Sequence, residues 1–466
     1  VANPPIPVEE AVRLASEAIE EPVPAGLLLP LDPDPVGLDR RQRFRVGLLP
    51  GEGVARLTWV PMAREQLSLC WRVELTRSRG GERYEVLVDV RNGEILLRRC
   101  LTLYAAEASY LVFTGDSPAP LRPTLPDPSS NQPPVVERTL LTLASLNPVA
   151  SPLGWIGDGE NETRGNNVDA HLDLDGDDYP DLPRPHGSPF RVFAPPFDPA
   201  RPAAENGEAA VVQLFYWCNV MHDRLYELGF TESAGNFQKD NFGRGGIGGD
   251  PVLADAQDGS GVNNANFTPS PDGEPGRIQM YVFDGMDPTR DGDLDAGIIL
   301  HEYAHGLSTR LVGGGVGISS LQAGGMGEGW SDFYALSMLT RPGEDPDACY
   351  ALGSYVTEGF FGLQENAYYG IRRYPYSTDL SKNPLTFQDI DPARISPHTG
   401  VPRSPVFPFA PGLAGEVHNQ GEVWCATLWD ARSRLIKKHG VDPGNRLMLQ
   451  LVTDGMKLSP PNPTFL

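Results

Sequence analysis

Apolar and polar residues alternate along two segments near the start of the chain. Residues 67–75 and 83–90 each place an apolar side chain at nearly every second position, and Asn92-Gly93 joins the second segment to another short apolar run. This alternation is typical of β-strands with one buried face, and Asn-Gly is typical of a tight hairpin turn. Residues 8–18 instead repeat apolar side chains at helical spacing. The pattern predicts a small α+β domain at the beginning of the chain.

Helical periodicity is the stronger signal later in the chain. Helices are expected over residues 209–228, 294–312, 327–340 and 415–439. Asp293 is the expected N-cap of the second of these, because aspartate commonly begins helices. Residues 137–300 are otherwise irregular, and from about residue 350 the pattern is mostly helical. Helices are thus expected to dominate the end of the chain.

Two segments rich in proline interrupt these patterns. Residues 30–36 and 115–136 contain few core-forming side chains, which is typical of linkers and loops. We therefore expect breaks between regions of regular structure at these two segments. The chain begins at Val1 with no visible signal peptide, and we expect that both of its ends are incomplete.

Composition limits the classes of function. The chain has 466 residues, with 61 acidic and 38 basic side chains, so its formal net charge is −23. An acidic excess argues against nucleic acid as a partner. No run of eighteen apolar residues occurs, so no membrane-spanning helix is expected. The five cysteines are too few for a disulfide scaffold, although Cys70 and Cys100 could pair because each lies in a strand-like run.

The strongest chemical signal is the sequence His-Glu-Tyr-Ala-His at residues 301–305, followed after twenty-three residues by Glu328. Residues four apart share one face of a helix, so His301 and His305 can bind one metal ion together. Glu328 offers a third ligand, which leaves a fourth position for water, as in catalytic zinc sites. Glu302 can act on that water as a general base. Asp332 lies one helical turn after Glu328 and can accept the free ring N–H of a ligating histidine.

An accidental match on a solvated helix is the alternative interpretation of this motif. Residues 294–300, which precede His301, are largely apolar, so the helix is expected to be buried. The chain has only eight histidines, and two of them lie in the motif. Both observations favour a metal site.

In this context the chain resembles the fungalysin family of secreted zinc metallopeptidases, which are relatives of thermolysin. The resemblance rests on residues 301–308 and 324–333 and extends over about residues 107–466. Further segments that resemble the family lie at residues 213–216, 228–232, 235–237, 256–260, 263–267 and 373–378.

The resemblance implies an α+β architecture of two domains. Residues 1–105 are similar to an α+β propeptide that assists folding and covers the active-site cleft; an unrelated accessory domain is the alternative. Residues 106–466 are expected to form a thermolysin-like peptidase, with a strand-rich lobe (106–312), a mainly helical lobe (313–466) and zinc in the cleft between them. A cleavage boundary is expected near Leu103–Ala108, before a strand at residues 109–113. The expected form is a monomeric zymogen.

The resemblance also implies a group that stabilises the oxyanion of the reaction. His418 is similar in position to the distant catalytic histidine of the family, and a structural histidine that caps a helix is the alternative. Thermolysin-like enzymes use a tyrosine shortly after the motif helix as well. Residues 311–318 contain no tyrosine, so this second donor is left open.

Four residues are implied as substrate contacts. The Asn264 side chain and the Ala265 carbonyl resemble those of the family's edge strand, which would bind an extended peptide; a plain turn before the strand at residues 277–283 is the alternative. Arg372 or Arg373 is expected to bind a substrate carbonyl. A buried ion pair is an equal alternative for these arginines.

A second metal site is suggested by carboxylates that alternate along one loop. Asp173, Asp175, Asp177 and Asp181 surround a glycine, as in sites for calcium. The pattern departs from an EF-hand, because Arg184 occupies the position of its last glutamate. An acidic loop that is merely solvated is the alternative.

Together these observations predict a secreted zinc metalloendopeptidase that cleaves peptides and proteins. A zinc-activated water would attack the peptide carbonyl, with Glu302 as general base and His418 beside the oxyanion. An exopeptidase would use the same core, but no group that could capture a free amine is recognisable. A non-catalytic surface protein stabilised by calcium is the alternative from another class.

Overall fold

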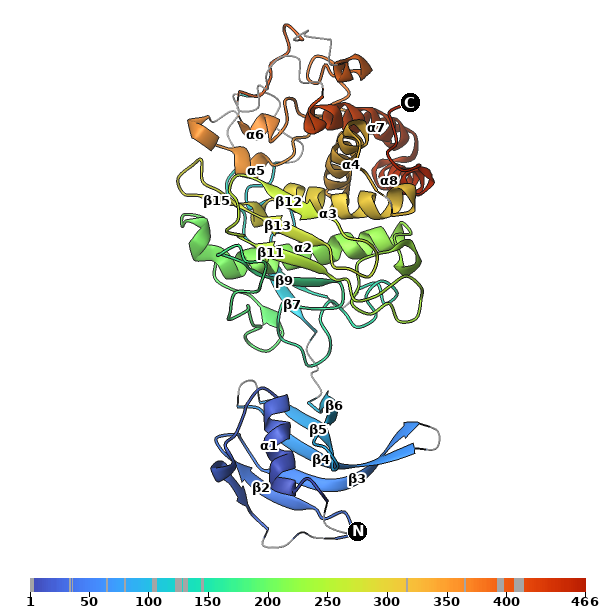
Figure 1. Cartoon of the computed structure of the whole chain (residues 1–466). Helices are drawn as coiled ribbons and strands as arrows, with labels where there is room; N and C mark the ends of the chain where they lie inside the picture. Colours follow the sequence, from blue (N-terminus) through green and yellow to red (C-terminus); the bar gives the residue numbers. More distant parts are fainter. Residues whose placement is uncertain are drawn as a thin grey trace. The chain divides into compact units, whose positions relative to one another are not determined.

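The computed structural model divides the chain into two compact units (Figure 1). The first comprises Val1–Ala106 with Asp158–Glu160, and the second comprises Glu107–Gly157 with Asn161–Leu466. The structure describes all residues except 1–3, 33–34, 36, 64–65, 79–80, 103–106, 122–127, 129–132, 144–145, 316, 364–365, 392–397 and 406–414. The expected cleavage boundary and much of the predicted break at residues 115–136 therefore lie outside the described residues.

The first unit is an antiparallel sheet of six strands in sequence order, with one helix packed against it. The strands are β1 (Leu28–Pro30), β2 (Gln42–Val46), β3 (Gly53–Ala63), β4 (Gln66–Thr76), β5 (Arg83–Asp89) and β6 (Ile95–Cys100). The helix α1 (Val8–Ala18) buries Ala11, Val12 and Ala15 in the core that it shares with the sheet. The predicted helix and the two alternating strands are confirmed. A role for this unit as a propeptide stays a prediction.

The suggested pairing of Cys70 with Cys100 is wrong, because both thiols are free. Cys70 lies on β4 opposite Asp89, and Cys100 lies on β6 opposite Tyr84, so the two cysteines face positions five residues apart on β5. Five residues of strand span about 16 Å. A disulfide requires α-carbon atoms about 4.4–6.8 Å apart.

The second unit begins with short strands around one long buried helix. One sheet has the order β10-β7-β8. A four-stranded sheet has the order β12-β13-β11-β9, and its strands are labelled in Figure 1. The strands of this unit are β7 (Ser109–Val112), β8 (Thr139–Thr142), β9 (Val168–Leu172), β10 (Val192–Phe193), β11 (Val252–Ala256), β12 (Ala265–Thr268), β13 (Arg277–Met280), β14 (Val282–Phe283) and β15 (Arg290–Asp291). The helix α2 (Gly207–Glu227) packs against β7, β9 and β11. It is buried on nearly every side, which explains its apolar sequence.

The prediction that residues 137–300 are irregular apart from α2 is therefore wrong, since these residues supply all four strands of that sheet. The strand expected at residues 277–283 is present as β13 and β14. Each strand of that sheet has only four or five residues. Alternation over so few positions is too short to stand out between long loops.

The rest of the second unit is helical. The helices are α3 (Ala296–Leu311), α4 (Leu321–Met338), α5 (Ser354–Thr357), α6 (Asn366–Tyr369), α7 (Val417–His439) and α8 (Val441–Leu458). Single 3-10 turns are η1 (Ala25–Leu27), η2 (Ala203–Asn206), η3 (Glu232–Ala234), η4 (Gly292–Leu294), η5 (Val312–Gly315), η6 (Phe360–Gly362) and η7 (Phe387–Ile390). The helix α4 packs against both α3 and α7, and α8 packs against α7 (Figure 1).

Two expectations for this helical part are corrected. The helix α4 begins at Leu321, six residues before the predicted start, and Ser320 caps it by accepting the N–H of Ala323. The glycines in its first turns weaken the helical signal. Between residues 350 and 416 the described chain forms only short turns of helix, because glycines with left-handed backbone, such as Gly353 and Gly370, interrupt it.

The observed class is mixed, with strands in the earlier part of the second unit and helices in the later part. Its core is one continuous cluster that joins the sheets to α2, α3 and α4. Within the described residues, no helix has the length and apolar character needed to cross a membrane.

Candidate metal centre

The helix α3 is anchored at its start by Asp295. The Asp295 carboxylate accepts the N–H of Gly297 at 3.1 Å and the N–H of Tyr355 at 3.1 Å. The prediction that Asp293 caps this helix is wrong, because Asp293 lies in the preceding turn η4 and the N-cap is Asp295. Burial raises the pKa of Asp295 to about 7.

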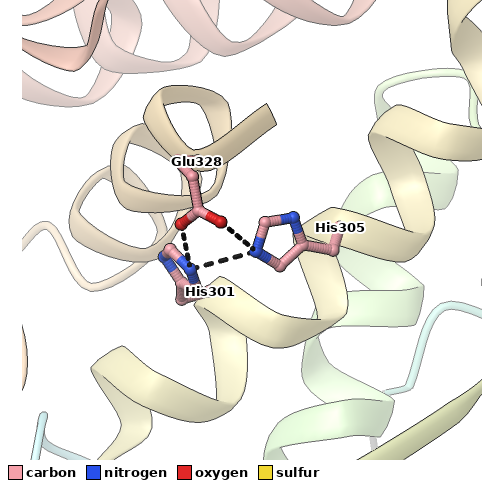
Figure 2. A group of neighbouring side chains, drawn as sticks. All are labelled: His301, His305 and Glu328. Atoms are coloured by element: carbon pink, nitrogen blue, oxygen red, sulfur yellow. Dashed lines mark hydrogen bonds and ion pairs between the residues drawn. The ribbon is translucent and has the colours of Figure 1, made fainter. Parts of the chain in front are cut away.

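Three side chains from α3 and α4 converge on one point, as Figure 2 shows. His301 Nε2 lies 3.1 Å from His305 Nε2 and 3.2 Å from Glu328 Oε2, and His305 Nε2 lies 3.6 Å from Glu328 Oε1. Ligand atoms bound at about 2.1 Å in a tetrahedron lie about 3.4 Å apart. The three atoms are thus spaced as zinc ligands would be.

The charges around this point suit a cation. Burial lowers the pKa of His305 to about 4, which keeps its imidazole neutral and able to bind metal. Although burial acts in the opposite direction, hydrogen bonds to Asp332 and Glu328 raise the pKa of His301 to about 10, so a metal ion bound here would have to displace the proton from its Nε2. Burial also raises the pKa of Glu302 to about 7, and the Glu328 charge adds to this increase. The Glu302 side chain is buried next to these residues, but it is not one of the three groups that converge.

Asp332 lies behind His301. Its Oδ1 is 2.7 Å from Nδ1 of His301, which leaves Nε2 of the ring for the metal point. The same carboxylate accepts hydrogen bonds from Arg372 Nε and Nη2, both at 2.7 Å, and from the hydroxyl of Tyr376. Tyr376 belongs to the segment at 373–378 that resembles the family, but the sequence suggested no role for it.

The two candidate arginines lie in different places. Arg372 is buried in its ion pair with Asp332, lies 3.7 Å from Glu328 and also lines the cavity described below. Arg373 pairs with Glu422 at 3.1 Å and donates to the carbonyl of Asn419. Arg373 is not among the residues that line the cavity. Both arginines thus form the ion pairs that the sequence left as an alternative.

His418 reaches the centre from the first turn of α7. Its Nε2 lies 3.5 Å from Glu328 Oε2, and its Nδ1 lies 2.5 Å from Glu416 Oε1. Glu416 caps the helix by accepting the N–H of Asn419. Although burial acts in the opposite direction, His418 lowers the pKa of Glu416 to about 2. Sequence reasoning missed Glu416, whose only signal was its place two residues before His418.

Glycines set the distance between α4 and α7. A side chain at Gly421 would overlap the Cβ of Glu328 and lie 2.9 Å from the backbone nitrogen of Gly329. A side chain at Gly329 would lie 2.6 Å from the carbonyl oxygen of Gly421. The two helices therefore approach backbone to backbone, and this brings His418 next to Glu328.

A cavity of about 790 Å³ opens over the centre. It is lined by His301, Glu302, His305, Glu328 and His418 and by residues 263–267, together with Phe283, Ile298, Phe360, Phe361, Ile371 and Arg372, among others. Asn264 and Ala265 thus lie in its wall, where β12 forms an edge of the four-stranded sheet. No tyrosine is among the described residues that line it, so the second oxyanion donor stays open.

The acidic loop forms two groups of carboxylates. Asp173 lies with Asp175 and Asp177 in one group and with Asp178, Asp255 and Asp258 in the other. Asp181 belongs to neither group, and its Oδ2 accepts the N–H of Leu174. Asp173 accepts the N–H groups of Asp177 and Asp178. Calcium binding at this loop stays a prediction.

Comparison with known proteins supplies independent findings. The profile of the family described as fungalysin metallopeptidase (M36) matches residues 127–466. The extracellular metalloproteinase 2 of Arthroderma gypseum is 38% identical over 420 residues, which cover 86% of this chain and 59% of that protein. The extracellular metalloproteinase mep of Aspergillus fumigatus is 37% identical over 431 residues, which cover 88% of this chain and 61% of that protein. The chain thus spans about three fifths of the length of these curated relatives.

Proposed function

Because this chain belongs to the fungalysin (M36) family of metallopeptidases, we propose that it is a zinc-dependent endopeptidase that cleaves peptide bonds in extended chains. The observation that carries the proposal is the convergence of His301, His305 and Glu328 at the separations that tetrahedral zinc requires. When bound, zinc supplies Lewis acidity that polarises a carbonyl and makes water acidic near neutral pH.

Glu302 is the group that moves protons. Burial raises the pKa of its carboxyl group, which suits a group that accepts a proton from the attacking water and returns it to the leaving amine. Burial supports this role, because a desolvated carboxylate is a stronger base than an exposed one. Asp332 keeps the Nδ1 proton of His301 in place, so that the ring presents its free Nε2 to the metal.

His418 is the group placed to stabilise the oxyanion. It lies at the edge of the metal centre, where its Nδ1 contacts Glu416 and its Nε2 lies 3.5 Å from Glu328 Oε2. The side chain is 46% exposed, so a substrate carbonyl can reach it.

The edge of the sheet is the surface that holds the substrate. Among the strands that the structure describes, β12 pairs with β13 alone, which leaves its other edge for an extended peptide. Asn264 and Ala265 lie at the start of this edge and line the cavity. Backbone pairing of this kind suits internal bonds of a long chain, which favours an endopeptidase over an exopeptidase.

We further infer secretion and latency. Both relatives described above carry the word extracellular in their names. Residues 1–105, as a propeptide, would keep the peptidase inactive until they are cut away, and the active form would be a monomer. Calcium at the acidic loop would stabilise the fold without taking part in the reaction.

The variant Glu302→Gln tests the proposed base. We expect the variant to bind one zinc ion per chain and to lose hydrolysis of a quenched peptide by about 10²–10⁴-fold in kcat. Glu205→Gln, at an exposed glutamate of η2, is the matched control and should keep full activity. Hydrolysis by Glu302→Gln at the rate of the unmodified chain would overturn the proposal.

Limited proteolysis tests latency. Activity is measured before and after a protease cuts near residue 105, with and without a zinc chelator. We expect activity to rise after the cut and to disappear with the chelator. Metal analysis that found calcium but no zinc would favour the non-catalytic alternative, and products released one residue at a time would favour an exopeptidase.

A further inference from the structure

Three phenylalanine rings form a continuous row along one wall of the cavity. Phe283, at the end of β14, contacts Phe360 edge to face with ring centres 6.1 Å apart. Phe360 contacts Phe361 with ring centres 4.2 Å apart. All three line the cavity, and Phe283 and Phe360 are buried. Phe361 alone among them is open to solvent, with 69% of its surface exposed.

The segment that carries Phe361 is held by contacts with Gly285. The N–H of Phe361 donates to the carbonyl of Gly285 at 2.8 Å. The ring of Phe360 packs directly on Gly285, where a Cβ atom would lie 2.6 Å from the ring. Gly359 and Gly362 flank the two rings with left-handed backbones, at φ 74° and 79°. The loop is thus a fixed support and not a loose chain.

Phe361 itself adopts an unfavourable conformation. Its φ is 52°, in the left-handed region where side chains other than glycine rarely lie. Because most of its surface is exposed, the Phe361 side chain contributes little free energy of burial to folding. A strained backbone that presents an exposed aromatic ring to a cavity is typical of a site where a ligand supplies the missing contact.

We propose that Phe361 is a specificity-determining residue that binds an apolar side chain, best an aromatic one, of the peptide in the cavity. This inference rests on the proposed function, because the ligand is the substrate. A peptide paired with β12 points alternate side chains to opposite faces of the sheet. The row of rings lines the same cavity as β12, so one of these side chains can stack on Phe361 while Phe360 supports it from behind.

The test uses a series of quenched peptides that differ in a single position. Phenylalanine or alanine is placed in turn at each of three positions on either side of one cleaved bond. The full chain is assayed before and after the limited proteolysis described above. We expect the unmodified chain to prefer phenylalanine at one position, and Phe361→Ala to raise KM for that peptide roughly tenfold with kcat nearly unchanged.

Three further variants test whether the effect of Phe361→Ala comes from a general loss of stability or activity. Phe361→Gly suits the left-handed backbone and should lose the preference while melting no lower than the unmodified chain. Phe361→Leu keeps an apolar contact and should retain part of the preference. Phe387→Ala removes an aromatic ring that is 50% exposed outside the cavity lining, and it should change neither KM nor kcat. A preference for phenylalanine that is equal in Phe361→Ala and the unmodified chain would overturn the proposal.

A binding experiment separates this proposal from the proposed catalysis. The same peptides, carrying a fluorophore, are titrated into zinc-loaded Glu302→Gln and into the double variant with Phe361→Ala, each after the limited proteolysis described above. Tighter binding of the phenylalanine peptide to Glu302→Gln alone supports the role of Phe361 even if the unmodified chain does not cleave. Equal binding of the two peptides to Glu302→Gln counts against Phe361, whatever the result of the cleavage assay.

Discussion

Gly421 and Glu328 lie so close across the α4–α7 contact that the Cβ of any other residue at position 421 would overlap the Cβ of Glu328. One helix carries Glu328, a proposed metal ligand, and the other carries His418. The absence of a side chain at Gly421 therefore determines how near these two groups lie. The 3.5 Å between His418 Nε2 and Glu328 Oε2 depends on this glycine.

Gly421→Ala is expected to separate α4 from α7. Overpacking of this kind lowers the free energy of unfolding by about 1–3 kcal/mol, and the better helix propensity of alanine raises it by at most about 1 kcal/mol. The free energy of unfolding in urea should fall, and kcat should fall with it as His418 moves from the oxyanion. Gly455→Ala on α8 is the control, because a Cβ there meets nothing within 4 Å. That control should gain about 0.5–1 kcal/mol. Equal stability of the two variants would contradict the argument.

Asp332→Asn is expected to weaken zinc binding. The amide cannot hold the Nδ1 proton of His301 as the carboxylate does, and losses of such partners lower metal affinity by about 10–100-fold. Competition with a chromophoric chelator measures this change. Glu422→Gln disturbs another buried carboxylate, which pairs with Arg373, and should leave zinc affinity unchanged. The same loss of affinity in both variants would mean that the effect is one of general stability.

His418→Asn is expected to reduce kcat with little change in KM or in zinc content. Removal of one oxyanion donor lowers kcat by about 10²–10³-fold in other hydrolases. Steady-state kinetics on one quenched peptide and metal analysis give the three quantities. His439→Asn, at the exposed far end of α7, is the matched control. A rise in KM with unchanged kcat would show that His418 only binds the substrate.

Asp295 is expected to make stability depend on pH. Burial raises its pKa from 3.8 to about 7 in the folded chain, so between pH 4 and 7 the folded chain keeps a proton that the unfolded chain has lost. The free energy of unfolding should therefore fall as pH rises through this range, by on the order of 4 kcal/mol for a shift of this size. Asparagine is an equally good N-cap, so Asp295→Asn should keep the helix start and remove this contribution.

Urea unfolding at pH 4, 5.5 and 7, with a chelator present throughout, measures the effect of Asp295. The other buried carboxyls, including Asp291 and Asp293, contribute the same slope to both chains and cancel in the difference. The stability of Asp295→Asn relative to the unmodified chain should increase with pH. A difference that is constant across the three pH values would show that Asp295 keeps an ordinary pKa.

The assignment to the fungalysin family and the convergence of His301, His305 and Glu328 could be predicted from the sequence. The reason is local: residues four apart on a helix share a face whatever surrounds it, so His301 with His305 and Glu328 with Asp332 needed no knowledge of tertiary structure. Glu416 and Tyr376 could not be found in this way. Their roles arise from contacts with His418 and Asp332 that only the folded chain creates.

The start of α4, the cysteine pairing and the roles of the two arginines also depend on contacts between distant parts of the chain. The glycines of α4 lower its helix propensity. They are nevertheless required where α7 approaches, because a Cβ atom there would collide with it, so packing outweighs propensity. Cys70 and Cys100 lie in strands as expected, yet the register across β5 keeps them apart. Arg372 and Arg373 are neighbours in sequence and face different carboxylates, Asp332 and Glu422.

The five free thiols have a practical consequence for the durability of this protein. Cys70, Cys218, Cys349 and Cys425 are buried, and burial raises the pKa of Cys70 to about 11, so it carries almost no thiolate at neutral pH. No covalent cross-link holds the fold, so exposure to reductants or to air should leave its melting temperature unchanged. Cys100 alone is partly exposed, which makes it the natural single attachment point for a maleimide dye.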